Sequence, residues 1–214
     1  MSVTKNILTR THDMLFVSSD PKLTAAAPLP AWATRAWLGR IPLAVRREPV
    51  IVPSFIPIRL LSPGGDEQVD AYIPREQVVT VVTPESLWWA KTWRLYAAWE
   101  HFPALALLEK LTAMLDRLEW NWGLIGQLGL SVASGCLLIN ENSPLQLLLR
   151  SELPFSREQA GAFYDAAGVD AGLLQIEVES PHGVFALENW LRDGQVALDG
   201  VHGPRLTATP WQAA

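Results

Sequence analysis

Cysteine and positive charge are both scarce in this sequence. Cys136 is the single cysteine among 214 residues, so no disulfide can form within the chain. The first ten residues, "MSVTKNILTR", do not resemble a secretory signal, and we therefore expect a cytoplasmic protein. Lys and Arg number 17 against 22 Asp and Glu. This balance provides no excess of positive charge for binding nucleic acid, which we exclude as a partner.

Common metal and phosphate motifs are also absent. The sequence has no HExxH motif, no pair of cysteines and no Walker loop. Four histidines lie far apart, and each is interpreted as a structural or surface residue rather than as a metal ligand: His12, His101, His182 and His202. The motifs therefore assign no residue to a metal ion.

No uninterrupted membrane-length run is present. The longest apolar stretch, residues 122–139, contains four glycines, Gln127 and two serines, and has no basic anchors at its ends. A spanning helix needs about 20 continuously apolar residues. We therefore interpret the stretch as part of a protein core and expect no membrane partner.

Apolar residues make up 49% of the chain and charged residues 18%, which is typical of a compact globular protein. Short Val- and Ile-rich runs over residues 42–82 predict strands, with breaks expected at Pro49, Pro53 and Pro57. Thr83 and Pro84 then have the residue types of a helix start. A helical period over residues 87–119 predicts two helices separated at Pro103.

The second half alternates between predicted strands and helices. Adjacent strands are expected at 130–140 and 145–150, a helix at 156–168 and a strand at 173–180. A turn and helix over 181–194 and a closing strand at 194–200 follow. The sequence thus predicts an α+β fold, with a small β-rich N-terminal domain (1–82) and a mixed-sheet domain (83–214).

The strand "LLQIEVES" places three polar side chains on one face, because Gln175, Glu177 and Glu179 are two residues apart. Two carboxylates on one face could hold a divalent cation such as Mg²⁺. A strand with one solvent-exposed face would show the same pattern.

Glycines and arginines supply further candidates. Glycines recur every third residue from Gly123, which is a weak signal for a phosphate-binding loop and also fits a tight turn. Several arginines could bind phosphate oxygens through paired hydrogen bonds, although each taken alone would be surface charge: Arg46, Arg47, Arg59 and Arg205.

Several strings, in order along the chain, resemble one family. "RTHDMLFV" is similar to its R-P-H-D-L-L-W-L, and "WGLIGQLGLSVASG" to its W-G-x-x-G-S-x-G-F-x-x-A-T-G. "NSPLQLLLR" resembles S-D-L-D-L-L-L-R, "IEVESPHGVFALENW" resembles V-x-x-E-T-P-x-G-A-x-x-L-x-E-W, and "GPRLTATPW" resembles G-P-R-L-x-x-x-P-W. The chain is identified as resembling the malonate decarboxylase holo-acyl-carrier-protein synthases. These are phosphoribosyl-dephospho-CoA transferases with a nucleotidyltransferase-type catalytic domain.

The resemblance implies a reaction. Such enzymes transfer a phosphoribosyl-dephospho-CoA group from triphosphoribosyl-dephospho-CoA to a serine of the acyl-carrier subunit of malonate decarboxylase, releasing pyrophosphate. In nucleotidyltransferase domains a Gly-Ser turn holds the phosphates, while an Asp-x-Asp pair and a third acid bind Mg²⁺. Physically this is metal and electrostatic stabilisation of phosphoryl transfer.

This sequence departs from the family at those groups. Gln127 replaces the serine, Pro144 and Gln146 stand at the Asp-x-Asp positions, and Gln175 corresponds to the third acid. The substrate-binding candidates are Gly126, Gln127 and Arg205. The catalytic candidates are Gln146, at a motif position of the family, and Glu177 and Glu179, which could in part substitute for the missing acids from one strand. Glutamine brings no negative charge and proline no side-chain ligand, so we expect weak binding of Mg²⁺.

Three hypotheses follow. The chain is the transferase that the resemblance implies, or a catalytically inactive relative that binds a nucleotide, a CoA-type ligand or the carrier protein. The third is a different nucleotidyl or CoA-ester enzyme with Glu177 and Glu179 as its acid pair.

Overall fold

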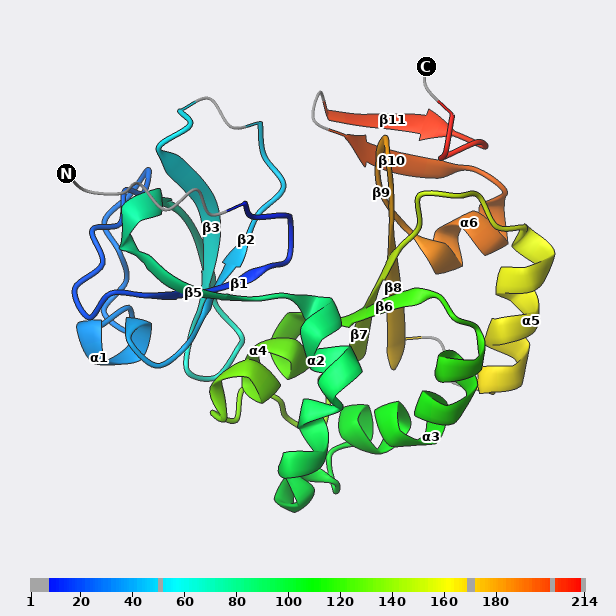
Figure 1. Ribbon diagram of the computed structural model, residues 1–214, viewed down its shortest axis with the longest axis horizontal. Coiled ribbons are helices and arrows are strands. Elements are labelled where there is room, and N and C mark those ends of the chain that lie inside the picture. Colours follow the sequence, from blue (N-terminus) through cyan, green and yellow to red (C-terminus); the bar gives the residue numbers. More distant parts are fainter. Residues whose placement is uncertain (1–7, 50–51, 169–171, 201–202, 213–214) are drawn as a thin grey trace.

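The computed structural model describes residues 8–49, 52–168, 172–200 and 203–212 (Figure 1). Within these ranges the chain folds into two β-sheets accompanied by helices. The predicted α+β class is confirmed. No helix in the described part of the chain has both the length and the apolar character needed to cross a membrane.

The first sheet contains five strands, all antiparallel, in the order β4-β3-β2-β1-β5. Its strands are β1 (Met14–Val17), β2 (Leu43–Val45), β3 (Phe55–Leu61), β4 (Gln68–Pro74) and β5 (Val78–Val82). Alternate residues of β3 (Ile56, Ile58 and Leu60) are buried, which is the pattern of a strand with one face on a core. A short helix, α1 (Arg35–Leu38), and a 3-10 turn, η1 (Arg75–Gln77), complete this half.

The expected strand break at Pro57 is wrong. Pro57 lies inside β3, paired with Tyr72 of β4. Its carbonyl accepts a hydrogen bond from the Arg46 N–H, beyond the end of β2. In an antiparallel strand the N–H and C=O of one residue point the same way. The missing N–H of Pro57 therefore faces the end of β2 and leaves the pairing with β4 intact.

Helices begin immediately after the first sheet. The side chain of Thr83 accepts a hydrogen bond from the Ser86 N–H and caps α2 (Pro84–Ala90), as the sequence predicts. Two 3-10 turns, η2 (Thr92–Leu95) and η3 (Ala97–Trp99), separate it from α3 (Pro103–Arg117), which starts at the predicted break. The apolar stripe of α3 is buried in the core.

The second sheet contains six strands in the order β11-β10-β9-β8-β7-β6. They are β6 (Asn121–Leu124), β7 (Leu145–Arg150), β8 (Leu174–Ser180), β9 (Gly183–Ala186), β10 (Val196–Gly200) and β11 (Gly203–Thr207). β7 and β8 run parallel and the other pairs antiparallel, so the sheet is mixed. Figure 1 shows α5 (Arg157–Ala167) and α6 (Leu187–Asp193) together on one side of it.

Two local predictions for this half were wrong. Residues 130–140, expected as a strand, form the second part of α4 (Gly126–Ser134) and an irregular segment. Leu128, Leu130 and Val132 of α4 are all buried and stand at every second position, as in a strand, which hides the helical spacing of Gln127, Ser131 and Ser134. Residues 183–186, expected in a turn and helix, form β9 because they pair with β8.

The buried side chains form two clusters. The larger lies among the second sheet and its helices and includes Met14 of β1; the smaller belongs to the first sheet. The predicted domain boundary after residue 82 falls between β5 and α2. Its role as a domain boundary stays a prediction.

A cleft between the two sheets

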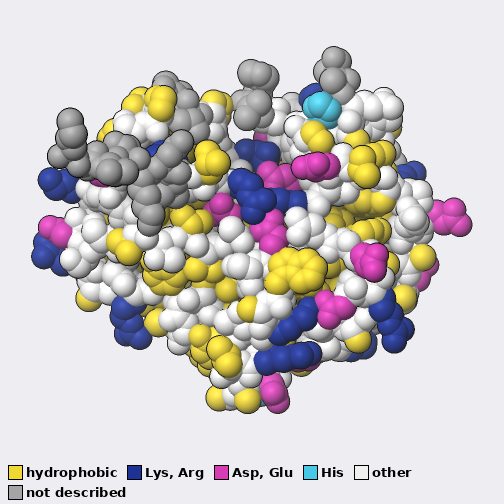
Figure 2. Space-filling view, in the orientation of Figure 1, with side chains coloured by type: hydrophobic (Ala, Val, Ile, Leu, Met, Phe, Trp, Pro, Cys, Tyr) yellow, Lys and Arg dark blue, Asp and Glu magenta, His cyan; other side chains and the backbone are white. Residues whose placement is uncertain are grey.

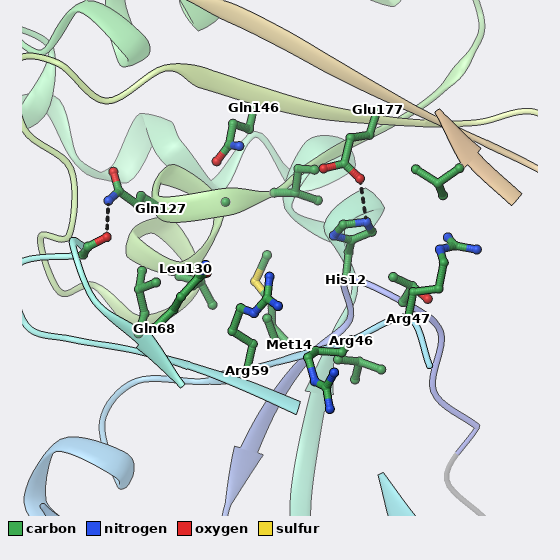
Figure 3. Close-up of a pocket in the computed structure, with 18 of the residues that line it drawn as sticks. His12, Met14, Arg46, Arg47, Arg59, Gln68, Gln127, Leu130, Gln146 and Glu177 are labelled. Atoms are coloured by element: carbon green, nitrogen blue, oxygen red, sulfur yellow. Dashed lines mark hydrogen bonds and ion pairs between the residues drawn. The ribbon is translucent and has the colours of Figure 1, made fainter. Parts of the chain in front are cut away.

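A cavity of about 560 Å³ lies between the two sheets (Figure 3). From the N-terminal half it is lined by His12, by residues that follow β2, and by Arg59 of β3. From the C-terminal half it is lined by the start of α4, by Gln146 of β7 and by Glu177 of β8. Side chains more than 100 residues apart in the sequence therefore face one cleft.

Three of the predicted phosphate-binding arginines lie in this cleft: Arg46, Arg47 and Arg59. Each is ion-paired, Arg46 with Glu48 (2.5 Å), Arg47 with Glu179 (3.2 Å) and Arg59 with Asp70 (2.7 Å). Figure 2 shows basic and acidic side chains gathered in the middle of the visible face, between the two halves. The cleft therefore offers guanidinium groups, each with an acidic partner.

The fourth arginine, Arg205, is not among the lining residues. It lies on β11, and its guanidinium donates a hydrogen bond to the Gln212 carbonyl (2.7 Å). Its predicted role in substrate binding has no support from this position.

The start of α4 is shaped by a close contact between two elements. Gly126 has φ +66°, and a Cβ at this position would lie 1.8 Å from Oε1 of Gln146. The left-handed backbone favours glycine, and a Cβ here would displace the end of the Gln146 side chain. Gln146 in turn donates from Nε2 to Oε1 of Gln175 on β8 (2.9 Å), its direct neighbour in the parallel register. The side-chain amides of these two glutamines thus form a hydrogen-bonded pair between β7 and β8.

Gln127 follows in the first turn of α4. Its Nε2 donates to the carbonyl of Gly65 in the β3–β4 turn (2.7 Å), and its Oε1 accepts from Ser143 Oγ (2.5 Å). We call these two contacts the α4 bridge. The side chain therefore joins the first sheet to the second at one end of the cleft.

The three polar residues predicted to share a face of β8 do so, and each has a partner from another element. Glu177 lies 3.1 Å from Nε2 of His12, and the two side chains point toward each other in Figure 3. Burial raises the pKa of Glu177, but the hydrogen bond and charge of His12 and the charge of Arg47 outweigh it. The pKa of Glu177 is therefore below its ordinary value.

His12 is the cleft residue that the sequence reasoning set aside. Its backbone is left-handed (φ 70°), which is uncommon for a residue other than glycine. The His12 N–H donates to the Val45 carbonyl, and Arg150 donates to the neighbouring Thr11 carbonyl (2.5 Å). The only sequence signal was its place in "RTHDMLFV".

A charged network lies behind the cleft. Arg150 of β7 donates to Glu179 of β8 (2.6 Å) and to Glu85 of α2, and Glu85 also accepts from Arg10 (3.1 Å). Asp13, immediately before β1, is 2% exposed, and burial raises its pKa above the ordinary value. The network ties β7, β8 and α2 to the segment that leads into β1.

Comparison with known proteins shows which family the chain resembles. Residues 92–210 match the family model described as the phosphoribosyl-dephospho-CoA transferase MdcG C-terminal domain. A phosphoribosyl-dephospho-CoA transferase of Klebsiella pneumoniae strain 342 is 31% identical over 94% of this chain and 96% of its own length. One of Pseudomonas syringae pv. tomato is 30% identical over 95% of this chain and 93% of its own length. This chain belongs to that family. No solved structure matches it.

The resemblance of this chain to the phosphoribosyl-dephospho-CoA transferases leads us to expect Mg²⁺-binding acids at the positions of Pro144, Gln146 and Gln175. These three residues do not fit the ion. Pro144 brings no side-chain ligand, and the two amides are hydrogen-bonded to each other. Glu177 and Glu179 are engaged by His12 and by Arg47 and Arg150. Among the described residues no group of three or more His, Cys, Asp or Glu is arranged to hold a metal ion.

Proposed function

We propose that the cleft binds a phosphoribosyl-dephospho-CoA-type ligand without a metal ion, and that magnesium-dependent transfer has been lost from this chain. The observation that carries the proposal is the hydrogen-bonded amide pair, Gln146 with Gln175, at the positions where the family resemblance expects carboxylates. The family membership supports the ligand class.

The physical reason is the balance of charge. Mg²⁺ prefers hard, charged oxygen ligands, and an amide oxygen supplies a dipole without a net charge. Phosphoryl transfer with a pyrophosphate leaving group relies on positive groups that offset developing negative charge. Arg46, Arg47 and Arg59 remain available in the cleft for this kind of contact, because a guanidinium can exchange a carboxylate for a phosphate in the same paired geometry.

Binding can be tested by calorimetry with dephospho-CoA in the presence of EDTA. Arg59 is the most exposed of the three arginines, at 42% of its side chain. We expect Arg59→Ala to weaken binding about tenfold, as the loss of one charge-assisted pair implies. The matched control is Arg192→Ala, which removes an exposed arginine paired with Asp193 on α6. Equal affinities for both variants would count against the cleft as the binding site.

Binding without a metal ion can be tested with a variant that restores carboxylates. We expect the double variant Pro144→Asp with Gln146→Asp to make nucleotide binding depend on Mg²⁺, because it adds two carboxylates, one of them directly opposite Gln175. Calorimetry with and without Mg²⁺ measures the difference. An intact fold with no change in Mg²⁺ affinity would show that the metal position is misplaced.

The second candidate function is transfer of the group to a serine of the malonate decarboxylase carrier subunit. It is favoured by the relatives, which are named phosphoribosyl-dephospho-CoA transferases and align over nearly the whole chain. The protein is incubated with the carrier subunit, Mg²⁺ and triphosphoribosyl-dephospho-CoA, and the carrier is weighed by mass spectrometry. An unmodified carrier is expected. A carrier gaining the full prosthetic group at a rate typical of the family would overturn the loss of transfer.

A further inference from the structure

His12 and Glu177 form an imidazole–carboxylate pair on the wall of the cleft. Nε2 of His12 lies 3.1 Å from a carboxylate oxygen of Glu177, and both residues line the cavity (Figure 3). Nδ1 of His12 forms no hydrogen bond or ion pair with any residue that the structure describes. When Glu177 accepts the Nε2 proton, a neutral imidazole carries its lone pair on Nδ1. Nδ1 is therefore the nitrogen that can take a proton from a bound molecule.

The backbone holds this imidazole in place at the edge of the cleft. The left-handed conformation of His12 (φ 70°) is fixed by the hydrogen bond from its N–H to the Val45 carbonyl (2.9 Å) and by the contact of Arg150 with the Thr11 carbonyl. Unfavourable backbone conformations of this kind cluster at functional sites. The His12 side chain is 22% exposed, so the pair is open to the cavity rather than sealed in the core.

Arg47 brings positive charge close to the same pair. It lines the cavity, its charge acts on the carboxylate of Glu177, and it donates to Glu179 (3.2 Å). Arg150 also donates to Glu179 (2.6 Å), so Glu179 keeps a cation when Arg47 contacts a ligand. A guanidinium offsets negative charge that develops on a phosphoryl group during its transfer. A phosphate ester bound to Arg47 would therefore lie near the imidazole of His12.

We infer that the cleft hydrolyses the diphosphate of a dephospho-CoA-type ligand without a metal ion, with His12 as the general base. Nδ1 takes a proton from a water molecule while the water oxygen forms a bond to one phosphorus. The bond from that phosphorus to the bridging oxygen breaks, and His12 passes the proton to the departing phosphate. The products are adenosine monophosphate and phosphopantetheine. Glu177 is a positioning residue that orients the imidazole and stabilises its charged form. The ligand class rests on the proposed function.

The test incubates dephospho-CoA with the protein in EDTA and measures both products by liquid chromatography with mass spectrometry. His12→Gly suits the left-handed backbone and leaves room for free imidazole. We expect this variant to lose at least about 100-fold in rate, and added imidazole to restore part of the loss. The matched control is His101→Ala, an exposed histidine that does not line the cavity; its rate should stay within about twofold of the wild type.

Glu177→Gln is the second variant, because it keeps an acceptor for Nε2 and removes the charge. It should lower kcat by about tenfold or more and change KM by less than about threefold, and it decides the question if His12→Gly does not fold. A wild-type protein that binds dephospho-CoA and releases neither product, wild-type rates in His12→Gly, or an unchanged kcat in Glu177→Gln would overturn the inference alone. A wild-type protein that shows no binding of dephospho-CoA by calorimetry would overturn the proposed function as well.

Discussion

Removing Arg150 should destabilise the protein through the charged network. Its side chain is 10% exposed and donates to Glu85, Glu179 and the Thr11 carbonyl. Breaking a buried ion pair by removing one partner costs about 3–5 kcal/mol, because the remaining charge is buried without compensation. Here each carboxylate keeps a second cation, Arg10 or Arg47. We therefore expect Arg150→Ala to cost about 3 kcal/mol, the low end of that range.

Thermal unfolding measures this loss. For a chain of this size, 1 kcal/mol corresponds to roughly 2–4 °C in the unfolding midpoint, so Arg150→Ala should lower the midpoint by about 6–12 °C. The control is Arg192→Ala, whose side chain is 66% exposed and should change the free energy of unfolding by less than about 0.5 kcal/mol. A loss below about 1 kcal/mol for Arg150→Ala would refute the reasoning that the network is a buried structural unit.

Two further predictions concern stability. Gly126→Ala should lower the free energy of unfolding by at least about 2 kcal/mol, because its Cβ would clash with Gln146 and its backbone is left-handed. Gly161→Ala in α5, with open space around it, should raise the free energy of unfolding by about 0.5–1 kcal/mol. Thermal melts compare the two, and similar effects would contradict the tight contact at α4. Burial raises the pKa of Asp13 above 3.8, so the folded state holds this proton more tightly than the unfolded state. The contribution of Asp13 to the free energy of unfolding therefore falls as the pH rises from about 4 through the folded-state pKa. In urea titrations at several pH values, the free energy of unfolding of Asp13→Asn should not show this fall. Identical pH dependence in the two proteins would exclude a raised pKa.

Local sequence rules predicted the elements whose ends depend on near neighbours. Thr83 caps α2 and Ser156 forms a capping box with Gln159 in α5, and both are recognisable within four residues. The same rules failed for α4, where buried apolar residues at every second position imitate a strand.

The candidate site was predicted in part. Gln146 and Glu177 both line the cleft. The resemblance pointed to Gln146, and the alternation of polar residues in "LLQIEVES" pointed to Glu177; their catalytic roles stay predictions. His12 was missed because a lone histidine near the beginning of a sequence carries no spacing pattern. Its significance appears when the fold brings it within 3.1 Å of Glu177.

The sequence by itself determined the α+β class and the family, since these depend on residue identity and order. It also predicts that Pro144, Gln146 and Gln175 stand where the resemblance expects carboxylates. The tertiary structure alone decided which distant residues these side chains meet. Gln127 meets Gly65 across 62 residues of chain, and Arg150 meets Thr11 across 139. Such contacts depend on how the two sheets pack against each other, and no local pattern encodes a hydrogen bond between residues so far apart.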